Sequence, residues 1–390
     1  MKKINEVFAN TFLVIVTTLV TFAILEAIAN FWLLNLANEK YFLRYASLKQ
    51  LQDSDISNLP RYSPHRYIGF YPTPGYIKGQ DRHNSLGYRG EEIEQPKPAG
   101  QFRIACLGGS TTYTSDVKDY RDSYPYLLEK YLKTRGYDKV SVINAGGGSW
   151  SSWESLVNFQ FRVLDLDPDL IIVYHGINDI SPRFVWPPEA FRGDNSGARA
   201  PNQTSIFMPG ILEYSTLLRI AMISTGLINS HASFETTIDR RPETYHGTQF
   251  NKQKIRGVYP EGVFREVSAA EILETNRADY FERNIRNIIA IASGHGIETV
   301  LGSFAFSPLF TDQPKVSSDE YIGAYREYNR LLEQLANDTD QHFFDFAAAF
   351  PTDKRWYTDG RHVNEEGAQL KAELFGNFLI DNRLLPIPQP

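Results

Sequence analysis

The residues of this chain whose types suggest chemistry begin with Ser110, which follows two glycines in the stretch FRIACLGGSTTYT at residues 102–114. An apolar run that meets glycines, a serine and threonines predicts a buried strand that turns into a helix. The serine would then lie at the carboxyl end of a sheet, where open α/β folds bind ligands. The helix start would also offer unpaired backbone N–H groups to an anion. The same pattern is common in ordinary loops, so this stretch alone leaves the role of Ser110 open.

Two further apolar runs also end in glycines. They are VSVINAGGGSW at residues 140–150 and LIIVYHGIND at residues 170–179, and Asn178 belongs to the end of the second run. If both are strands of one parallel sheet, their ends lie beside Ser110, where backbone N–H groups and the Asn178 amide could hold an oxyanion. By itself, an Asn-Asp pair after a strand is usually a turn.

A carboxylate and an imidazole stand three residues apart near the C-terminus, in TDGRHVNEEG at residues 358–367. His362 could take the proton of Ser110, since imidazole is the side chain that titrates near neutral pH without help. Asp359 could fold back and hold the ring nitrogen that faces away from the serine. Alone, an Asp-x-x-His pair is usually a surface ion pair. With Ser110 and Asn178 it completes the groups needed for acyl transfer through an oxyanion intermediate.

In this order the four stretches resemble the sequence blocks of the SGNH (GDSL-type) hydrolase superfamily, whose members are serine esterases, lipases and carbohydrate deacetylases. The resemblance covers roughly residues 84–381, because NSLGYRGEE ahead of Ser110 is also similar to a lead-in of extracytoplasmic members. It implies a Ser-His-Asp triad. It also implies an oxyanion hole formed by the N–H of Ser110, an N–H near Gly148 and the side-chain amide of Asn178.

The chain departs from the superfamily pattern at two positions. Gly109 stands where the first block usually has Asp, although Gly-Gly-Ser-Thr is a familiar variant. An ungapped alignment puts Ser149 where the oxyanion glycine is expected, with Gly148 one position earlier, so either residue could donate the second N–H. The elbow of the α/β-hydrolase fold is the rival scaffold. It needs Gly-x-Ser-x-Gly, whereas residues 108–112 read GGSTT.

Apolar strands alternate with helical stripes after residue 101, which indicates βαβ units and a parallel sheet covered on both faces. Together with the resemblance, this predicts a three-layer α/β/α flavodoxin-like fold with a parallel central sheet of about five strands. Ser317 and Glu320 read as a capping box ahead of a long helix. Pro and Gly before residue 101 mark a boundary. We therefore expect a connector at residues 38–100 that packs on the domain, and a hydrolase domain at residues 101–390.

The N-terminus predicts a membrane anchor at residues 1–37, a transmembrane helix. Two lysines precede an apolar run at residues 9–36 whose only charge is Glu26, and about 20 apolar residues span a bilayer. A competing prediction is a cleaved signal peptide with Ala27-Ile28-Ala29 as its cleavage site, and a third is a buried core helix. The lysines would keep the N-terminus in the cytoplasm and put the rest of the chain in the periplasm or outside the cell.

Residues 181–275 interrupt the alternation and form an insertion far longer than an ordinary connection. Since they follow Asn178, we expect them to emerge beside the site, either as a cap or substrate-binding wall or as a surface excursion. Their apolar part, residues 211–228, contains two charged side chains, so it predicts an amphipathic or buried helix rather than a second membrane span. A polar run that contains Arg and Tyr follows at residues 239–259.

Composition excludes several classes of protein. The formal net charge is −6 and no polybasic run is present, which argues against nucleic-acid binding. The single cysteine, Cys106, rules out an intramolecular disulfide and reads as a small core residue rather than a reactive thiol. His175 and Asp179 flank the Gly-Ile-Asn stretch without further ligands at suitable spacing, so we expect neither a metal nor a cofactor.

Three functions remain open. The leading hypothesis is a membrane-anchored, extracytoplasmic esterase that removes acyl groups, above all acetyl groups, from a carbohydrate or lipid. The second is an O-acyltransferase that uses the same triad on envelope polysaccharide. The third is a non-catalytic glycan-binding or assembly factor, against which the intact set of triad residues argues. The substrate class follows only from the family resemblance, and the sequence leaves the oligomeric state undetermined.

Overall fold

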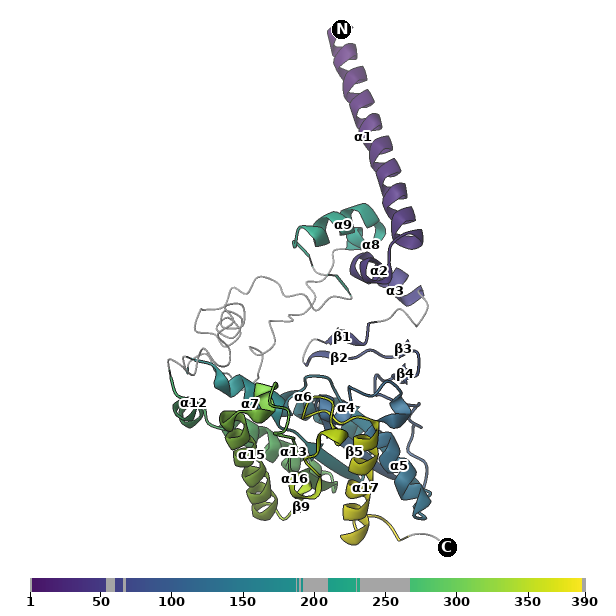
Figure 1. The fold of residues 1–390 in the computed structure, drawn as a ribbon. Coiled ribbons are helices and arrows are strands. Elements are labelled where there is room, and N and C mark those ends of the chain that lie inside the picture. The colour runs from purple at the N-terminus through teal and green to yellow at the C-terminus, as the bar shows by residue number, and fades with distance from the viewer. Residues whose placement is uncertain are drawn as a thin grey trace. The chain divides into compact units, whose positions relative to one another are not determined.

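The computed structural model describes residues 2–53, 60–65, 68–186, 188, 191, 210–228, 230–231 and 267–387. The chain forms two compact units, which we call the helical unit and the sheet unit (Figure 1). The helical unit comprises Met1–Phe70 and Asn202–Thr237, and the sheet unit comprises Tyr71–Pro201 and Ile238–Pro390. Every residue of the candidate site belongs to the sheet unit.

The sheet unit is organised around five parallel strands in the order β6-β5-β7-β8-β9. Their bounds are β5 Phe102–Gly108, β6 Val140–Gly146, β7 Leu170–Tyr174, β8 Glu298–Gly302 and β9 His342–Phe344. The central strand β7 is buried along its whole length, because helices cover both faces of a parallel sheet. Since β5 pairs with β6 on one side and β7 on the other, the carboxyl ends of these strands meet. The predicted parallel sheet is confirmed.

Helices form a layer on each face of this sheet, which confirms the predicted three-layer fold (Figure 1). In one layer α5, Tyr124–Thr134, packs on α17, Glu365–Asp381. In the other layer α13, Asp279–Gly294, packs on α6, Ser152–Asn158, and on α15, Asp319–Asp338. Buried apolar side chains on α5, α13 and α15 recur at helical spacing and contribute to the core.

The start of α15 corrects one prediction. Ser318, not Ser317, is the N-cap of α15, and its hydroxyl accepts a hydrogen bond from the Tyr321 amide. Ser317 is the last residue of the one-turn helix α14, Pro314–Ser317, where its hydroxyl donates to the carbonyl of Gln313. The predicted capping box is therefore wrong, because a preceding helical turn takes up Ser317.

The described residues also form several short elements. They include β1 Tyr62–His65, β2 Gly69–Pro72, β3 Ile77–Lys78, β4 Asp81–Arg82, α4 Ser110–Tyr113, α7 Ile177–Ile180, α12 Ala269–Thr275 and α16 Phe346–Ala349. α6 continues into a π-helical turn, Phe159–Val163, and a 3-10 turn, Leu164–Leu166. Because α4 and α7 follow directly after β5 and β7, they hold their first residues at the carboxyl edge of the sheet.

The two ends of the insertion at residues 181–275 lie side by side in the sheet unit. The buried guanidinium of Arg183 donates to the carbonyls of Leu273 (3.1 Å) and Asn276 (2.7 Å). The side chain of Asn276 donates back to the Arg183 carbonyl at 2.7 Å. The polar run at residues 239–259 lies outside the described residues, so both expectations for the insertion, a cap or substrate-binding wall and a surface excursion, stay predictions.

The helical unit contains the predicted apolar N-terminal helix. α1, Lys2–Asn35, includes Ala9–Asn35, the one helix of the described chain that is long and apolar enough to cross a membrane, with mean hydropathy 2.4. The short helices α2, Glu39–Tyr45, and α3, Leu48–Asp53, follow it. The apolar segment 211–228 forms α8, Gly210–Tyr214, and α9, Thr216–Ser224, each too short to span a bilayer. The predicted amphipathic or buried helix is therefore divided at Ser215 into two short helices, each with buried and exposed apolar positions.

Candidate active site

Ser110 lies at the turn between β5 and α4, as the sequence predicts. It is the first residue of α4, so its backbone N–H is one of those that a helix leaves without an intrahelical acceptor. The two preceding glycines are needed because a Cβ on Gly108 would collide with a side-chain oxygen of α4. A Cβ on Gly109 would lie 2.7 Å from both Asn178 Nδ2 and the Trp150 carbonyl oxygen. This crowding favours glycine at position 109, where the superfamily pattern usually has Asp.

The structure brings His362 and Asp359 to Ser110. His362 Nε2 lies 2.7 Å from Ser110 Oγ, and His362 Nδ1 lies 2.9 Å from Asp359 Oδ2. Side chains 252 positions apart in the sequence thus join one series of hydrogen bonds. When Nδ1–H donates to the carboxylate, Nε2 is left as the acceptor for the Ser110 hydroxyl. The His362 side chain is 17% exposed and Ser110 is half-buried, so both remain accessible from solvent.

A tight turn sets the geometry between Asp359 and His362. Asp359 Oδ1 accepts hydrogen bonds from the backbone N–H groups of Arg361 (3.0 Å) and His362 (2.9 Å). Gly360 has φ +85°, a left-handed conformation that residues with side chains rarely adopt. The Thr358 N–H donates to the His362 carbonyl at 2.9 Å and closes the turn. The backbone therefore fixes the carboxylate against the imidazole before any substrate binds.

Asp359 is held in its ionised form. Burial alone would raise the pKa of this carboxyl, but the hydrogen bond and electrostatic interaction with His362 and the positive charge of Arg361 outweigh burial and hold the pKa well below its usual value. Arg361 Nη2 donates to Asp359 Oδ2 at 2.6 Å. An ionised Asp359 can orient the imidazole and stabilise an imidazolium when His362 accepts a proton.

Asn178 lies on α7, at the end of β7, and its side chain reaches the turn that carries Ser110. Its Nδ2 donates to the Trp150 carbonyl at 2.9 Å. A side-chain amide has two N–H donors, so one is available to an oxyanion while the other keeps this contact. Gly148 is half-buried, and Ser149 is exposed with φ +62°. That one of these two residues supplies the second backbone N–H stays a prediction.

Arg89 holds α4 at its C-terminal end. Its buried guanidinium donates to the carbonyls of Tyr113 (2.8 Å), Thr114 (2.7 Å) and Val117 (2.8 Å). Its Nε donates to Asp81 Oδ1 at 2.8 Å. A cation is favoured there, because the last carbonyls of a helix carry partial negative charge. Sequence reasoning missed Arg89, although it lies in the NSLGYRGEE lead-in that the resemblance singles out.

Lys371 of α17 is a second buried basic side chain in contact with α4. Its Nζ donates to the Thr111 carbonyl at 3.2 Å and lies 3.6 Å from the centre of the Tyr174 ring. Burial lowers the pKa of this ammonium well below its usual value. Sequence reasoning missed Lys371 too. The available signal was a lysine whose neighbours at helical spacing, Ala368 and Phe375, are apolar.

The His175 and Asp179 side chains have structural partners. His175 Nε2 lies 2.9 Å from Ser155 Oγ, and Asp179 accepts hydrogen bonds from the N–H and the hydroxyl of Ser152. These contacts tie the start of α6 to α7, which carries Asn178. Within the described ranges, no group of at least three His, Cys, Asp or Glu residues is placed to hold a metal ion.

Comparison with known proteins gives one family match. Residues 106–370, more than half of the chain, match the model of the GDSL-like lipase/acylhydrolase family. No curated protein sequence matches the chain. The match includes Ser110, Asn178, Asp359 and His362.

Solved structures also align with the chain. A lipase/acylhydrolase from Enterococcus faecalis is 13% identical with a TM-score of 0.42, and the alignment covers 74% of this chain and 100% of that one. The acetyl xylan esterase AlAXEase is 16% identical with a TM-score of 0.41, over 71% of this chain and 100% of that one. The acetylxylan esterase Axe2 from Geobacillus stearothermophilus, solved as a catalytic mutant, is 13% identical with a TM-score of 0.41, over 72% and 94%.

Proposed function

The chain belongs to the GDSL-like lipase/acylhydrolase family and is an ester-hydrolysing enzyme, and we propose that it is a serine esterase with Ser110 as its nucleophile. The observation that carries the proposal is the hydrogen-bonded series Ser110–His362–Asp359, with distances of 2.7 and 2.9 Å. The proposed substrate is an acyl ester, above all an acetyl ester, of a carbohydrate or lipid. A serine activated by a neighbouring base needs no cofactor for this chemistry.

In the first half of the reaction, His362 Nε2 takes the proton of the Ser110 hydroxyl as Oγ attacks the carbonyl carbon of the ester. Asp359 holds the imidazole and stabilises the imidazolium that forms. The carbonyl oxygen becomes an oxyanion, which accepts hydrogen bonds from the Ser110 N–H, an N–H near Gly148 and Asn178 Nδ2. The imidazolium then gives its proton to the alcohol oxygen, the C–O bond breaks, and an acyl-serine remains.

The second half uses the same groups on water. His362 takes a proton from a water molecule, whose oxygen attacks the acyl-serine carbonyl, and the oxyanion forms again. When the tetrahedral intermediate collapses, the proton returns to Ser110 Oγ and the carboxylic acid leaves. If a sugar hydroxyl attacked instead of water, the product would be a new ester, so the same residues could also carry out acyl transfer.

Asn178→Ala is expected to lower kcat roughly 100- to 1000-fold with little change in KM, because this donor acts on the oxyanion and not on the bound ester. Steady-state hydrolysis of p-nitrophenyl acetate measures the effect. Asn382→Ala, an exposed position at the end of α17, is the control and should leave kcat unchanged. Wild-type turnover in folded Asn178→Ala would remove Asn178 from the oxyanion hole.

Asp359→Asn is expected to lower kcat by about 10⁴-fold, because the amide no longer selects the imidazole tautomer that activates the serine. It should also change how stability depends on pH. Because folding lowers the pKa of Asp359, its ionised form stabilises the folded state above about pH 4, and this contribution is lost as the pH falls below that value. The difference in unfolding free energy between wild type and Asp359→Asn should therefore shrink on acidification.

Urea denaturation at a series of pH values measures that difference. Asp312→Asn is the matched control, because this aspartate is exposed; its difference from wild type should stay nearly constant with pH. A difference for Asp359→Asn that is equally large at neutral and at acid pH would show that the ionised carboxylate is not what stabilises the turn.

We also propose that α1 holds the enzyme at a membrane, with the N-terminus in the cytoplasm and the hydrolase domain in the periplasm or outside the cell. The apolar span Ala9–Asn35 and the lysines ahead of it support this topology. The proposed boundaries are residues 1–37 for the anchor, 38–100 for a connector, and 101–390 for the hydrolase domain with its insertion at about 181–275. The compact units divide these segments further: the connector belongs to the sheet unit from Tyr71 on, whereas its earlier part and Asn202–Thr237 of the insertion belong to the helical unit.

Acetate release from an acetylated polysaccharide and from an acetylated glycerolipid tests the substrate class. With full-length enzyme in detergent micelles, we expect release from one of the two, and no release by Ser110→Ala. A free sugar added as acceptor separates the two reactions, since an esterase yields mainly acetate and a transferase yields the acetylated sugar. A folded wild-type enzyme that cleaves neither substrate nor p-nitrophenyl acetate would contradict the proposal.

A further inference from the structure

α1 carries one carboxylate in its otherwise apolar span, and the structure gives that carboxylate a partner. Glu26 accepts hydrogen bonds from Ser215 Oγ (2.7 Å) and from the backbone N–H groups of Thr216 (2.6 Å) and Leu217 (3.1 Å). These donors form the N-terminus of α9, where unpaired N–H groups favour an anion. An acidic side chain within a membrane helix is costly unless it has a partner, and these hydrogen bonds supply one.

The contact extends along one face of α1. Asn30, one turn after Glu26, accepts hydrogen bonds from Thr216 Oγ1 and Gln50 Nε2, each at 3.3 Å. Leu33, almost one further turn along, is only 1% exposed. It belongs to a small apolar cluster whose other buried members are Tyr45, Leu212, Ile223 and Ile228. The last turns of α1 are therefore a packed part of the helical unit.

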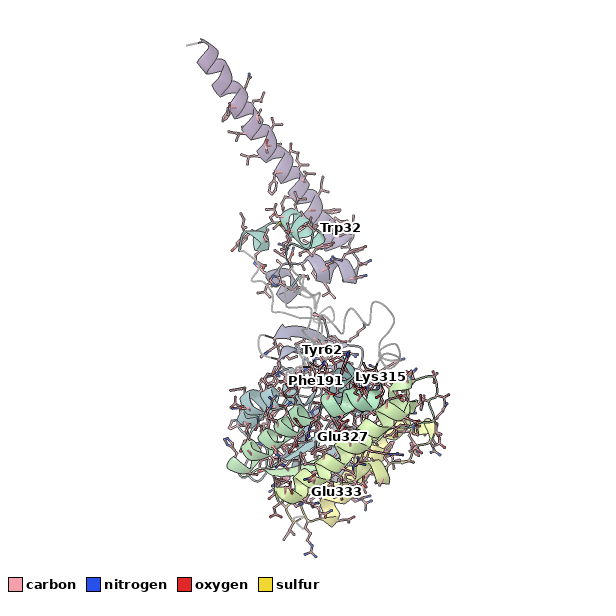
Figure 2. The ribbon with its side chains drawn as sticks, turned by 90° about the vertical axis from the view of Figure 1, so that its left-hand side faces the viewer. Trp32, Tyr62, Phe191, Lys315, Glu327 and Glu333 are labelled. Atoms are coloured by element: carbon pink, nitrogen blue, oxygen red, sulfur yellow. The ribbon has the colours of Figure 1, made fainter. Side chains whose placement is uncertain are left out.

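The position of Glu26 along the span places this contact near a membrane surface. Glu26 lies 17 residues after Ala9, which is about 25 Å along a helix, and the hydrocarbon core of a bilayer is about 30 Å thick. Trp32, labelled in Figure 2 at the end of α1 where the other helices of its unit gather, lies beside Tyr41 with ring centroids 6.0 Å apart. Tryptophan and tyrosine are enriched at the membrane–water boundary.

The positively charged side chain of α9, Arg219, is buried and does not lie on the surface of residues 210–228. Arg219 is 1% exposed and donates to the carbonyls of Tyr45 (2.9 Å) and Leu212 (2.8 Å). The large exposed side chains that remain on residues 210–228 are apolar or aromatic. They are Ile211, Tyr214 and Leu227, which are 69%, 90% and 62% exposed. Buried charge and exposed apolar side chains together suit a lipid boundary better than water.

We infer that residues 210–228 form a second membrane contact. They dock on the end of α1 through Glu26, and their exposed apolar side chains lie in the lipid interface. The inference rests on the proposed membrane anchor. Lipid is favoured as the occupant because the exposed apolar side chains of α1 continue to this end of the helix, with Phe31 60% and Leu34 52% exposed. The inference also requires that α1 is retained, since cleavage after Ala29 would remove Glu26 and uncap α9.

A fluorescent label at position 214 tests the contact in full-length protein reconstituted into phosphatidylcholine vesicles. Cys106 is fully buried, as predicted for a core residue, and burial raises the pKa of its thiol to about 12, so an environment-sensitive thiol dye reacts with Tyr214→Cys alone. We expect lipids that carry a nitroxide near the headgroup to quench the dye. Glu26→Leu should abolish this quenching, because the N-terminus of α9 loses its acceptor.

Glu26→Leu makes α1 more apolar, so the variant should still float with vesicles in a density gradient. Thr17→Leu is the matched control. It makes the same kind of change at an exposed position of the span away from Glu26, and it should leave the quenching unchanged. Intact-mass measurement of chains extracted from cell membranes should show that residues 1–29 are still attached.

The outcomes separate the inference from the anchor on which it rests. Wild-type protein that does not float with vesicles would contradict the anchor itself. Protein that floats with vesicles, but whose label at position 214 is not quenched by lipid, would overturn only the inference. Protein that is dimeric in nanodiscs, with the label of one copy shielded by the other copy, would do the same. A membrane-extracted chain that begins at Asn30 would also overturn it.

Discussion

Ser110→Ala and His362→Ala are each expected to lower kcat for ester hydrolysis by about 10⁴-fold or more, with KM little changed. In the proposed mechanism Ser110 Oγ bonds to the acyl group and His362 Nε2, 2.7 Å away, is the base. Because nucleophile and base act as one unit, the double variant should be scarcely slower than either single variant. Initial rates with p-nitrophenyl acetate, at equal concentrations of folded enzyme, measure all three.

Two neighbouring residues on the surface of the sheet unit provide matched controls. Ser293→Ala and His295→Ala change the same residue types at exposed positions near the end of α13, and both should retain wild-type kcat. A Ser110→Ala variant with more than a small fraction of wild-type turnover would mean that another group attacks the ester. Losses that multiply in the double variant would mean that Ser110 and His362 act independently.

Arg89→Met is expected to lower the free energy of unfolding by about 3–5 kcal/mol, because it leaves a buried carboxylate without its cation. The partner is Asp81, whose Oδ1 lies 2.8 Å from Arg89 Nε, and three backbone carbonyls lose the same donor. Activity should fall as well. A shift of α4 by about 1 Å would move Ser110 out of line with His362 and could cost about 100-fold in kcat.

Urea denaturation and kcat per folded molecule, measured below the unfolding transition, separate the two effects. Arg89→Lys keeps the charge but not the guanidinium fork, so its free energy of unfolding and its kcat should both lie between those of Arg89→Met and wild type. Arg135→Met is the control, because Arg135 is exposed, and it should change stability by no more than about 0.5 kcal/mol. An Arg89→Met enzyme as stable as wild type would contradict the account. A destabilised enzyme with unchanged kcat would show that Arg89 contributes to stability but not to the placement of Ser110.

The strands and the candidate site could be predicted because both leave local patterns in the sequence. Apolar runs that end in glycines mark β5, β6 and β7, and parallel strands bring such ends to one edge of a sheet. Ser110 and Asn178 lie in the short helical turns that come after two of those ends, and Asp359 and His362 share one turn. The positions of these four residues therefore needed no knowledge of distant contacts.

The buried basic side chains that hold α4 were not predicted, because their acceptors lie far away in the sequence and the local signal for burial is weak. Arg89 lies in a stretch that reads as a polar connector, and its three carbonyl acceptors occur 24 to 28 residues later in the chain. Lys371 meets the Thr111 carbonyl across 260 positions. The wrong capping prediction has a similar origin. Residues 317 and 318 are both serines, and only the helical turn before α15 shows that Ser318 is the N-cap.

The most direct test of the central claim, an activated serine at position 110, is labelling with a fluorophosphonate, which reacts covalently with such serines. Intact mass spectrometry would follow the full-length enzyme in detergent, beside Ser110→Ala and His362→Ala. We expect one adduct per wild-type chain, no adduct on Ser110→Ala, and adduct formation on His362→Ala slowed to near the background rate. Folded wild-type enzyme that stays unlabelled, or a Ser110→Ala variant labelled as fast as wild type, would contradict the claim.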